Sequence, residues 1–323
     1  MKDPFFVKPM PWLVQLAQPL CDRVGFPTLP LHIHQVLLGA LFYSVIFYSV
    51  SPTVSRILVP KLYAKLPKKR RLNWDAHVVS MIQSLLINGL AIWVMMTDKE
   101  RAAMTWEERI WGYTGAMSMI QGLAAGYFVW DFVVTSLNFD VFGIGTFAHA
   151  VAALLVFSFG FRPFVNYYGC TFILWELSTP FLNVHWFMDK LGMTGSRAQL
   201  YNGFLLLFTF FSCRLVYGTY QSVRVFGDIW AAMDNNPSVA SLNSATMGFA
   251  NEASTVPVWL GAIYLASNLT LNGLNFYWFI MMVKAVRKRF EPEKQPQTEI
   301  EVDSSSLASG ISNAGMKAHR RKA

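Results

Sequence analysis

A series of long apolar stretches is the feature that most constrains the fold of this chain. A helix needs about 20 consecutive, mostly apolar residues to cross a bilayer. Seven stretches reach this length, over residues 31–51, 75–97, 112–137, 143–161, 163–182, 202–226 and 256–283. The sequence therefore predicts an all-α, polytopic membrane helix bundle with about seven transmembrane helices, in which one N-terminal span precedes a six-helix core.

The composition favours a membrane protein over a nucleic-acid-binding one. Only 14% of the 323 residues are charged, whereas soluble domains carry about 25%. The net charge of +8 comes from basic residues that cluster between and after the apolar stretches, as membrane-topology signals do. We therefore expect membrane lipids, and no nucleic acid, as partners. The three cysteines show no metal-ligand spacing, so we expect no metal site. We also expect no bound cofactor.

The distribution of Lys and Arg predicts how the bundle is oriented. Six of them lie in residues 61–71 and four more follow the seventh stretch, whereas residues 227–255 contain none. Because basic loops stay on the cytosolic side, we expect a lumenal N-terminus and a cytosolic C-terminus. The loop "TDKERAAMTWEER" departs from this rule, with three basic residues on the predicted lumenal side.

The same pattern divides the chain into four segments. Residues 1–30 mix aromatic residues with prolines and are expected at the membrane interface, and residues 31–60 hold the first span. Residues 66–289 form the main helical domain. Residues 290–323 are polar, rich in serine and nearly free of aromatic residues, which predicts a disordered cytosolic tail.

Polar and ionisable residues inside the apolar stretches are the candidates for function. An ionisable group costs roughly 2.5–3.5 kcal/mol to insert, so it usually faces the interior of the bundle. Six of the predicted helices carry polar groups of this kind, and a shared interior cavity would accommodate them together. The candidate set is His77, Tyr127, Asp131, His149, Glu176, Asn183, Arg214, Asn272 and Asn275.

Charge balance suggests how this set would be arranged. Arg214 would neutralise Asp131 or Glu176, and the remaining acid would need a proton, water or His149. Pro180 would free backbone carbonyls in the fifth helix, which is tolerated only where protein or water satisfies them.

Structural interpretations compete with these functional ones. Interhelical amide contacts are typical packing interactions worth about 0.6 kcal/mol, and this interpretation is favoured for the asparagines of the seventh helix. Arg214 is typical of a counter-ion. His77 lies near a helix start, where an interfacial position is as consistent with the sequence as a place in the site.

Three motifs, in this order, resemble the TLC-domain family. They are "GYFVWDFVV" (126–134), "FAHAVAALL" (147–155) and "ELSTPFLNVHWF" (176–187). Their order and approximate spacing are similar to that family over residues 66–289, so the main helical domain resembles a TLC domain. The family contains the ceramide synthases and a larger group of other multi-span membrane proteins.

The resemblance implies a protein of lipid metabolism or homeostasis in the endoplasmic reticulum. In ceramide synthases, two adjacent histidines with nearby acids serve the transfer of a fatty acyl group from acyl-CoA to a long-chain amine. The corresponding position here reads His149–Ala150. The chain is therefore more similar to the branch outside the ceramide synthases.

Three functions follow as alternatives. An acyl-CoA-dependent lipid acyltransferase would use His149 as base or nucleophile with Asp131 or Glu176 as its acidic partner, while the other six candidates would line the cavity. A non-enzymatic lipid-binding, sensing or trafficking protein would use the same cavity for head groups. A cargo receptor of the endoplasmic reticulum would need the polar core only for structure. The sequence leaves open whether the chain is an enzyme and whether it forms a homo-oligomer.

Overall fold

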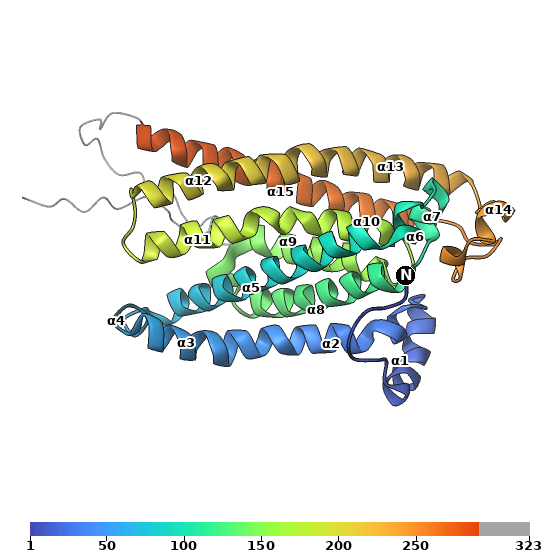
Figure 1. Cartoon of the computed structure of the whole chain (residues 1–323), viewed down its shortest axis with the longest axis horizontal. Coiled ribbons are helices and arrows are strands. Elements are labelled where there is room, and N and C mark those ends of the chain that lie inside the picture. Colours follow the sequence, from blue (N-terminus) through green and yellow to red (C-terminus); the bar gives the residue numbers. More distant parts are fainter. Residues whose placement is uncertain (291–323) are drawn as a thin grey trace, which may run out of the picture.

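The computed structural model describes residues 1–290, and this part of the chain consists of helices and connections, without a strand (Figure 1). The predicted all-α class is therefore confirmed. The predicted disordered tail lies outside the described residues, apart from Phe290 at the end of the last helix.

The elements are α1 (Pro11–Val24), α2 (Leu29–Val45), η1 (Ile46–Val50), α3 (Ser51–Leu58), α4 (Pro60–Tyr63), α5 (Lys68–Thr97), α6 (Lys99–Ala102), α7 (Trp106–Trp111), α8 (Gly115–Leu137), α9 (Phe139–Phe159), α10 (Asn166–Phe172), η2 (Ile173–Ser178), α11 (Thr179–Lys190), α12 (Arg197–Phe210), η3 (Phe211–Tyr217), α13 (Gly218–Asp234), α14 (Val239–Leu242), η4 (Ala245–Met247) and α15 (Val258–Phe290).

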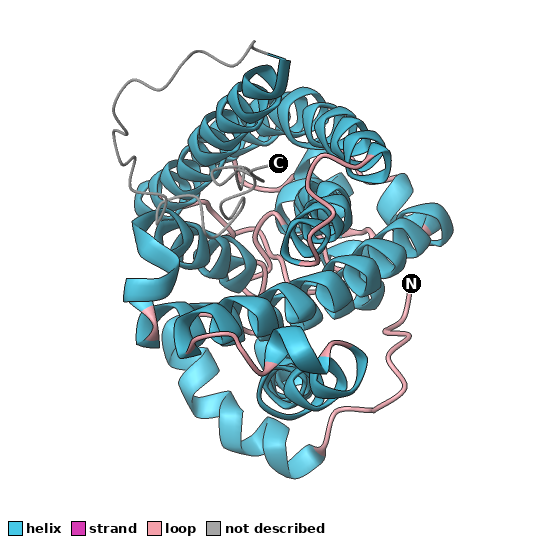
Figure 2. Ribbon diagram, turned by 90° about the vertical axis from the view of Figure 1, so that its left-hand side faces the viewer, coloured by secondary structure: helices cyan, strands magenta, loops and turns pink. Residues whose placement is uncertain are grey.

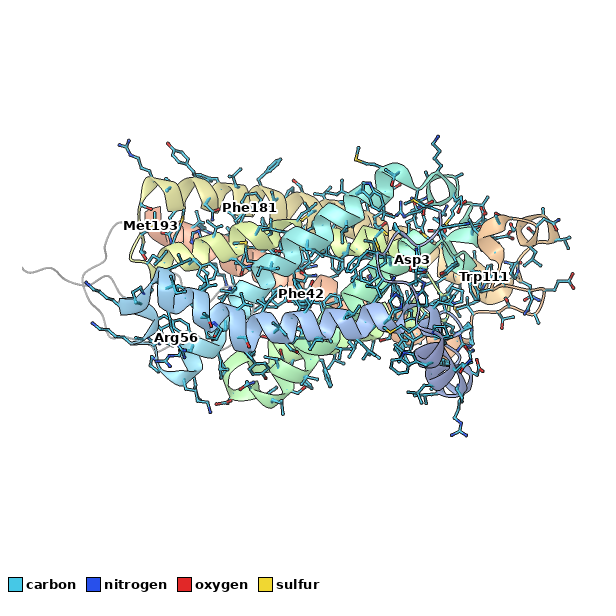
Figure 3. The ribbon with its side chains drawn as sticks, turned by 60° about the horizontal axis from the view of Figure 1, so that its bottom comes forward. Asp3, Phe42, Arg56, Trp111, Phe181 and Met193 are labelled. Atoms are coloured by element: carbon cyan, nitrogen blue, oxygen red, sulfur yellow. The ribbon has the colours of Figure 1, made fainter. Side chains whose placement is uncertain are left out.

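The long helices run roughly along one axis, so the bundle has two ends (Figure 1). The basic end contains α4, the start of α5 and the connection between α11 and α12, and Figure 2 looks along the bundle from this end. The opposite, amino-terminal end contains Met1, α6, α7 and α14. Figure 3 shows Arg56 and Met193 at the basic end and Asp3 and Trp111 at the amino-terminal end. Segments predicted to be cytosolic and lumenal thus lie at opposite ends.

Five helical segments of the described chain are long and apolar enough to cross a membrane, which confirms the polytopic character. They are Leu29–Leu58, Lys68–Thr97, Trp106–Leu137, Phe139–Phe159 and Arg197–Met233. The predicted stretch 163–182 is broken into α10, η2 and the start of α11. The predicted stretch 256–283 lies mostly within the continuous 33-residue α15, whose apolar sequence contains three asparagines. The number of seven spans stays a prediction.

Helices α2 and α8 pack closely because both present glycine at their contact. A Cβ atom on Gly126 of α8 would lie 2.5 Å from the carbonyl oxygen of Val36 and 3.1 Å from the Cα atom of Gly39. Small residues allow this approach of two backbones in membrane helices. A second glycine, Gly143, has φ 76° and produces a kink in α9, a conformation that side chains with a Cβ rarely adopt.

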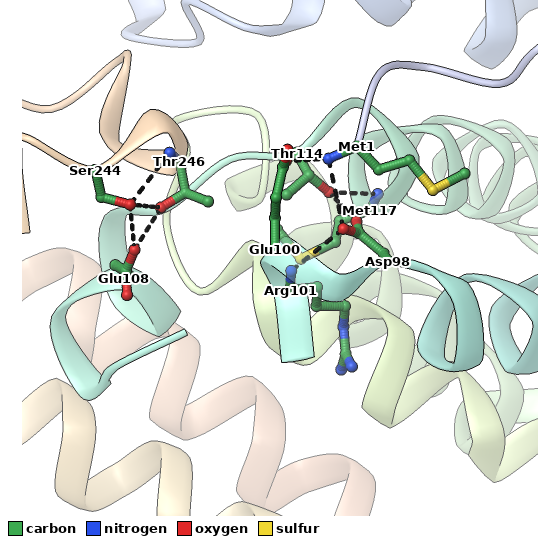
Figure 4. Close-up of polar contacts among 9 residues, drawn as sticks. All are labelled: Met1, Asp98, Glu100, Arg101, Glu108, Thr114, Met117, Ser244 and Thr246. Carbon is green, nitrogen blue, oxygen red and sulfur yellow. Dashed lines mark hydrogen bonds and ion pairs between the residues drawn. The ribbon is translucent and has the colours of Figure 1, made fainter. Parts of the chain in front are cut away.

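Hydrogen bonds tie the short elements of the amino-terminal end together (Figure 4). The Glu108 carboxylate in α7 accepts from the hydroxyls of Ser244, at 2.5 Å, and Thr246, at 2.7 Å. The Asp98 carboxylate lies 3.4 Å from the ammonium group of Met1. These contacts hold the chain start, α7 and the connection before α15 at one place.

A buried ion pair links α7 to α13. Arg109 donates from Nε and Nη2 to the two carboxylate oxygens of Asp228, at 2.8 and 2.9 Å, and the Tyr168 hydroxyl donates to the same carboxylate at 2.5 Å. The sixth apolar stretch ends at residue 226 in the sequence, which predicts Asp228 in the connection 227–255, and this prediction is wrong. Helix α13 instead continues past it, because the residues on its inner face are fully buried: Val225, Ile229 and Ala232.

The basic end has its own polar anchor. The Asp75 carboxylate in α5 accepts from the hydroxyls of Ser51, at 2.6 Å, and Tyr63, at 2.9 Å. Burial and, after it, the neighbouring Asp75 carboxylate raise the pKa of the Tyr63 hydroxyl, so Tyr63 remains a donor at neutral pH. The connection between the first two long helices is thereby fixed to the start of α5.

Candidate functional site

A cavity of about 100 Å³ lies inside the half of the bundle next to the basic end, here called the basic half. Side chains from α5, α8, α9, η2, α11, the end of α12, η3 and the last part of α15 form its walls. Seven of the nine predicted site residues line it: His77, Tyr127, Asp131, His149, Glu176, Asn183 and Arg214. One water-sized group needs roughly 10–15 Å³ on this scale. The cavity therefore has room for a polar head group of several atoms, whereas a long acyl chain would extend outside it.

Two irregular helical stretches place the charged residues of the cavity. Glu176 lies in η2, a 3₁₀ helix, and Arg214 lies in η3, a π-helix. Just before Pro180, the N–H of Thr179 bonds to the carbonyl of Glu176, three residues back. The carbonyl oxygen of Trp175 accepts from Arg214 Nε at 2.7 Å. The Arg214 side chain thus satisfies the Trp175 carbonyl near the proline. The π-helical form of η3 is a second indication, because π-helical turns are frequent at functional sites.

Arg214 is held firmly at the cavity wall. Its Nη1 donates to Asn275 Oδ1 at 2.9 Å, its Nη2 donates to Thr179 Oγ1 at 3.1 Å, and its Nε also reaches Ser178 Oγ at 3.1 Å. The nearest oxygen of Glu176 is 3.8 Å from Nη2. Of the two acids that the sequence offered as partners, Arg214 therefore pairs with Glu176. The guanidinium supplies a fixed positive charge beside the cavity.

Asp131 and His149 have few partners within the protein. Asp131 accepts one long hydrogen bond, 3.4 Å from Thr135 Oγ1, and no cationic side chain of the described chain forms an ion pair with it. His149 makes no hydrogen bond to another described residue, and its ring packs near Phe128 and Trp278, with ring centroids 6.3 and 5.9 Å away. The histidine–carboxylate hydrogen bond that the acyltransferase interpretation expected is therefore not formed in the described chain. Both side chains are partly exposed, so a ligand in the cavity can reach them.

His77 lies at the side of the cavity nearer the basic end. Its Nδ1 lies 2.7 Å from Asn183 Oδ1, and its ring stacks on Trp186 with a centroid distance of 4.0 Å. The sequence left an interfacial position and a site position open for His77. The structure buries it in the cavity wall, with 7% of its surface exposed.

A second, smaller cavity of about 30 Å³ lies beside the first. His149, Glu176 and Arg214 line both cavities, and Asn275 lines only the smaller one. Asn272 lines neither of them, because its Nδ2 donates to Ser222 Oγ on α13 at 3.0 Å. This contact matches the packing interpretation of the asparagines on α15.

Other cavity residues were missed by sequence reasoning. Serine and threonine are common inside membrane helices, so their presence alone carries no signal. Two of them follow a predicted residue at helical spacing, Ser80 after His77 and Thr135 after Asp131, and that spacing could have identified them. The missed residues include Asn73, Ser80, Thr135, Thr146, Thr179 and Trp278.

The fold and the cavity define an all-helical, polytopic membrane protein with a polar cavity inside its bundle. Residues 73–284 match the model of the TLC domain. This match covers more than half of the chain, and the chain belongs to the TLC-domain family, as its motifs predicted.

Relatives along most of the chain support the same assignment. An uncharacterized TLC domain-containing protein of Schizosaccharomyces pombe is 40% identical over 292 residues, which cover 90% of this chain and 91% of the relative. Topoisomerase I damage affected protein 4 of Saccharomyces cerevisiae is 25% identical over 81% of this chain and 86% of its own length. TLC domain-containing protein 4 of Homo sapiens is 28% identical over 57% of this chain and 73% of its own length. These relatives are not ceramide synthases, which places the chain on the predicted branch.

Proposed function

We propose that the chain acts in lipid homeostasis by binding the polar head of a membrane lipid in the cavity of the basic half. The observation that carries this proposal is the convergence of Asp131, His149, Glu176 and Arg214, from four helical elements, on one cavity. Ionisable groups at membrane depth are costly, and they mark ligand pathways and sites in membrane proteins. The volume suits a head group, while the acyl chains stay in the bilayer.

The charges around the cavity favour a head that donates hydrogen bonds. Asp131 has no cationic partner in the described chain. Glu176 has the guanidinium of Arg214 as its partner, with 3.8 Å between Nη2 and the nearest carboxylate oxygen. Carboxylates accept hydrogen bonds from hydroxyl and amine groups. A head with a free hydroxyl or amine would therefore satisfy the acceptors of this cavity.

Comparative lipidomics on cells that lack the protein tests the proposal. Cells are rescued with the wild type, Glu176→Gln or Glu252→Gln, each at equal abundance. Glu252 is exposed in the connection before α15 and provides the isosteric control. We expect the wild type and Glu252→Gln to restore the shifted lipid class and Glu176→Gln to fail. Full rescue by Glu176→Gln would contradict the proposal.

Acyl transfer at His149 is the second candidate function. One observation favours it: the His149 imidazole lines the cavity and is not committed to a hydrogen bond within the described chain. As a general base, His149 would take the proton of an attacking hydroxyl or amine. The new bond to the acyl carbon forms as the thioester bond of acyl-CoA breaks, and the proton passes to the departing thiolate.

Purified protein with isotope-labelled acyl-CoA and a lipid extract tests this chemistry. Labelled acylated lipid should form with the wild type and with Glu252→Gln, and should fall to background with His149→Ala. If His149→Ala forms product at the wild-type rate, acyl transfer by His149 is refuted, and the lipid-binding proposal still stands.

We also propose that the protein resides in the endoplasmic reticulum with its amino-terminal end in the lumen. The absence of basic residues from 227–255 supports this orientation. A glycosylation acceptor inserted near Asn251 should be modified, and one inserted near Lys65 should not. Modification near Lys65 and not near Asn251 would show that the orientation is the reverse of the one proposed.

A further inference from the structure

The imidazole of His77 is fixed in one tautomer. Its Nδ1 lies 2.7 Å from the Oδ1 atom of Asn183, and that oxygen can only accept, so Nδ1 carries the hydrogen. The Asn183 amide is itself oriented, because its Nδ2 donates to Ser80 Oγ at 3.1 Å. In the neutral ring the other nitrogen, Nε2, is therefore a hydrogen-bond acceptor.

This acceptor has no partner in the described chain. His77 Nε2 is buried, and no donor lies within hydrogen-bond distance of it. A buried acceptor without a donor is unfavourable, and native structures leave few of them. His77 is one of the residues that line the cavity, so a ligand bound there is the remaining source of a donor for Nε2.

The ring is also held in place. It stacks on Trp186 with an angle of 21° between the two planes. The ammonium group of Lys190 lies 5.3 Å from the centroid of the same indole. The stacked indole fixes the plane of the imidazole and therefore the direction in which Nε2 faces.

We infer that His77 Nε2 binds the hydroxyl group of a lipid head in the cavity. This inference rests on the proposed lipid-binding function and narrows it to lipids that carry a free hydroxyl. It gives His77 the selective role within the site, because His77 holds an acceptor in a fixed position. Asp131 and His149, on α8 and α9, remain available to the rest of the head.

Two substitutions test the roles of the two ring nitrogens separately. Asparagine places an amide nitrogen where Nδ1 lies, so His77→Asn keeps a donor toward Asn183 and removes the acceptor. Glutamine reaches the position of Nε2, so His77→Gln keeps an acceptor there. If the acceptor selects the lipid, only His77→Asn should lose selectivity.

The full chain is reconstituted in phosphatidylcholine nanodiscs, whose head group offers no hydrogen-bond donor. The probes are a photoreactive diacylglycerol with a free hydroxyl and its O-methyl ether, and labelled peptides are identified by mass spectrometry. In the wild type, we expect the hydroxyl probe to label cavity peptides roughly threefold to tenfold more than the ether, the ratio that one neutral hydrogen bond supplies. His77→Gln should keep this preference, and His77→Asn should label equally with both probes.

The other outcomes are distinguishable. Equal labelling of the wild type by both probes, or a preference that persists in His77→Asn, overturns the role of His77 and leaves lipid binding intact. Cavity peptides that neither probe labels overturn both proposals. If His77→Asn does not fold, Asn183→Leu replaces it, because it removes the oxygen that orients the ring. A preference that persists in Asn183→Leu also overturns the inference.

Discussion

The polar cluster around Asp228 and the cavity of the basic half differ in how their buried polar groups are paired. In the half next to the amino-terminal end, charged groups meet partners: Asp228 receives three hydrogen bonds from Arg109 and Tyr168. In the basic half, Asp131 has one long hydrogen bond and His149 has none to the described chain. Paired buried groups stabilise a fold, whereas unpaired ones cost free energy. The difference indicates that the polar cluster around Asp228 is arranged for stability and the cavity of the basic half for a ligand.

The largest effect is expected from Asp228→Asn in the amino-terminal half. The change leaves the buried Arg109 without its counter-charge, and breaking a buried pair in this way costs about 3 kcal/mol. The free energy of unfolding, measured by SDS titration in bicelles, should fall by that amount. A loss below about 1 kcal/mol, the size of one ordinary hydrogen bond, would show that the pair does not stabilise this half.

Gly126→Val should have the next largest effect. A Cβ atom at this position would lie 2.5 Å from the carbonyl oxygen of Val36, and overpacking of this kind costs roughly 1–3 kcal/mol. Gly89→Val is the control, because a Cβ built there has no atom within 4 Å beyond its own stretch of helix. Equal losses in both variants, on the same titration, would mean that the close contact of α2 and α8 is not what matters.

Asn272→Ala should have a small effect. It removes the hydrogen bond to Ser222 between α15 and α13, and such contacts in membranes are worth about 0.6 kcal/mol. Thr270→Ala is the matched control, because the Thr270 hydroxyl bonds only to the backbone of its own helix. A lipidomic defect in cells rescued with Asn272→Ala would argue for a functional role instead.

Asp131→Asn should leave the free energy of unfolding unchanged or raise it. The substitution makes the same chemical change as Asp228→Asn, but it removes a carboxylate that has no cationic partner in the described chain. The same variant should fail to restore the lipid profile, because the cavity loses a carboxyl oxygen that accepts a hydrogen bond from the lipid head. A loss of stability as large as that of Asp228→Asn would abolish the distinction between the two halves.

The helices were predictable because the apolar length of a membrane span is a strong constraint. Their ends were less so, because helices continue beyond the apolar region wherever a neighbour covers them. Helix α5 begins at Lys68, in the basic loop, and α13 continues past Asp228. The loop that departs from the topology rule also has a structural explanation. Two of its basic residues, Arg101 and Arg109, make internal hydrogen bonds.

The sequence could predict which residues line the cavity, but it could not predict which of them form an ion pair. Polar residues in apolar stretches identified seven cavity residues, since each must avoid lipid. The choice of Glu176 over Asp131 by Arg214 depends on the π-helical turn of η3, which no composition signal marks. The turn ends directly before Gly218, which meets the indole of Trp175 so closely that a side chain on residue 218 would overlap it. Such a contact exists only once both helices are placed.

The π-helix η3 sets the rotational phase of the helix that follows it. Helices α12, η3 and α13 are continuous, with Arg214 in η3 and Asp228 in α13. Each residue advances an α-helix by roughly 100°, so one residue gained or lost in η3 turns the whole of α13 by about that angle. A single deletion there would rotate Asp228 away from Arg109 while leaving both charges in the sequence. The seven residues that place a cation beside the cavity therefore also determine which face α13 presents at the far end of the molecule.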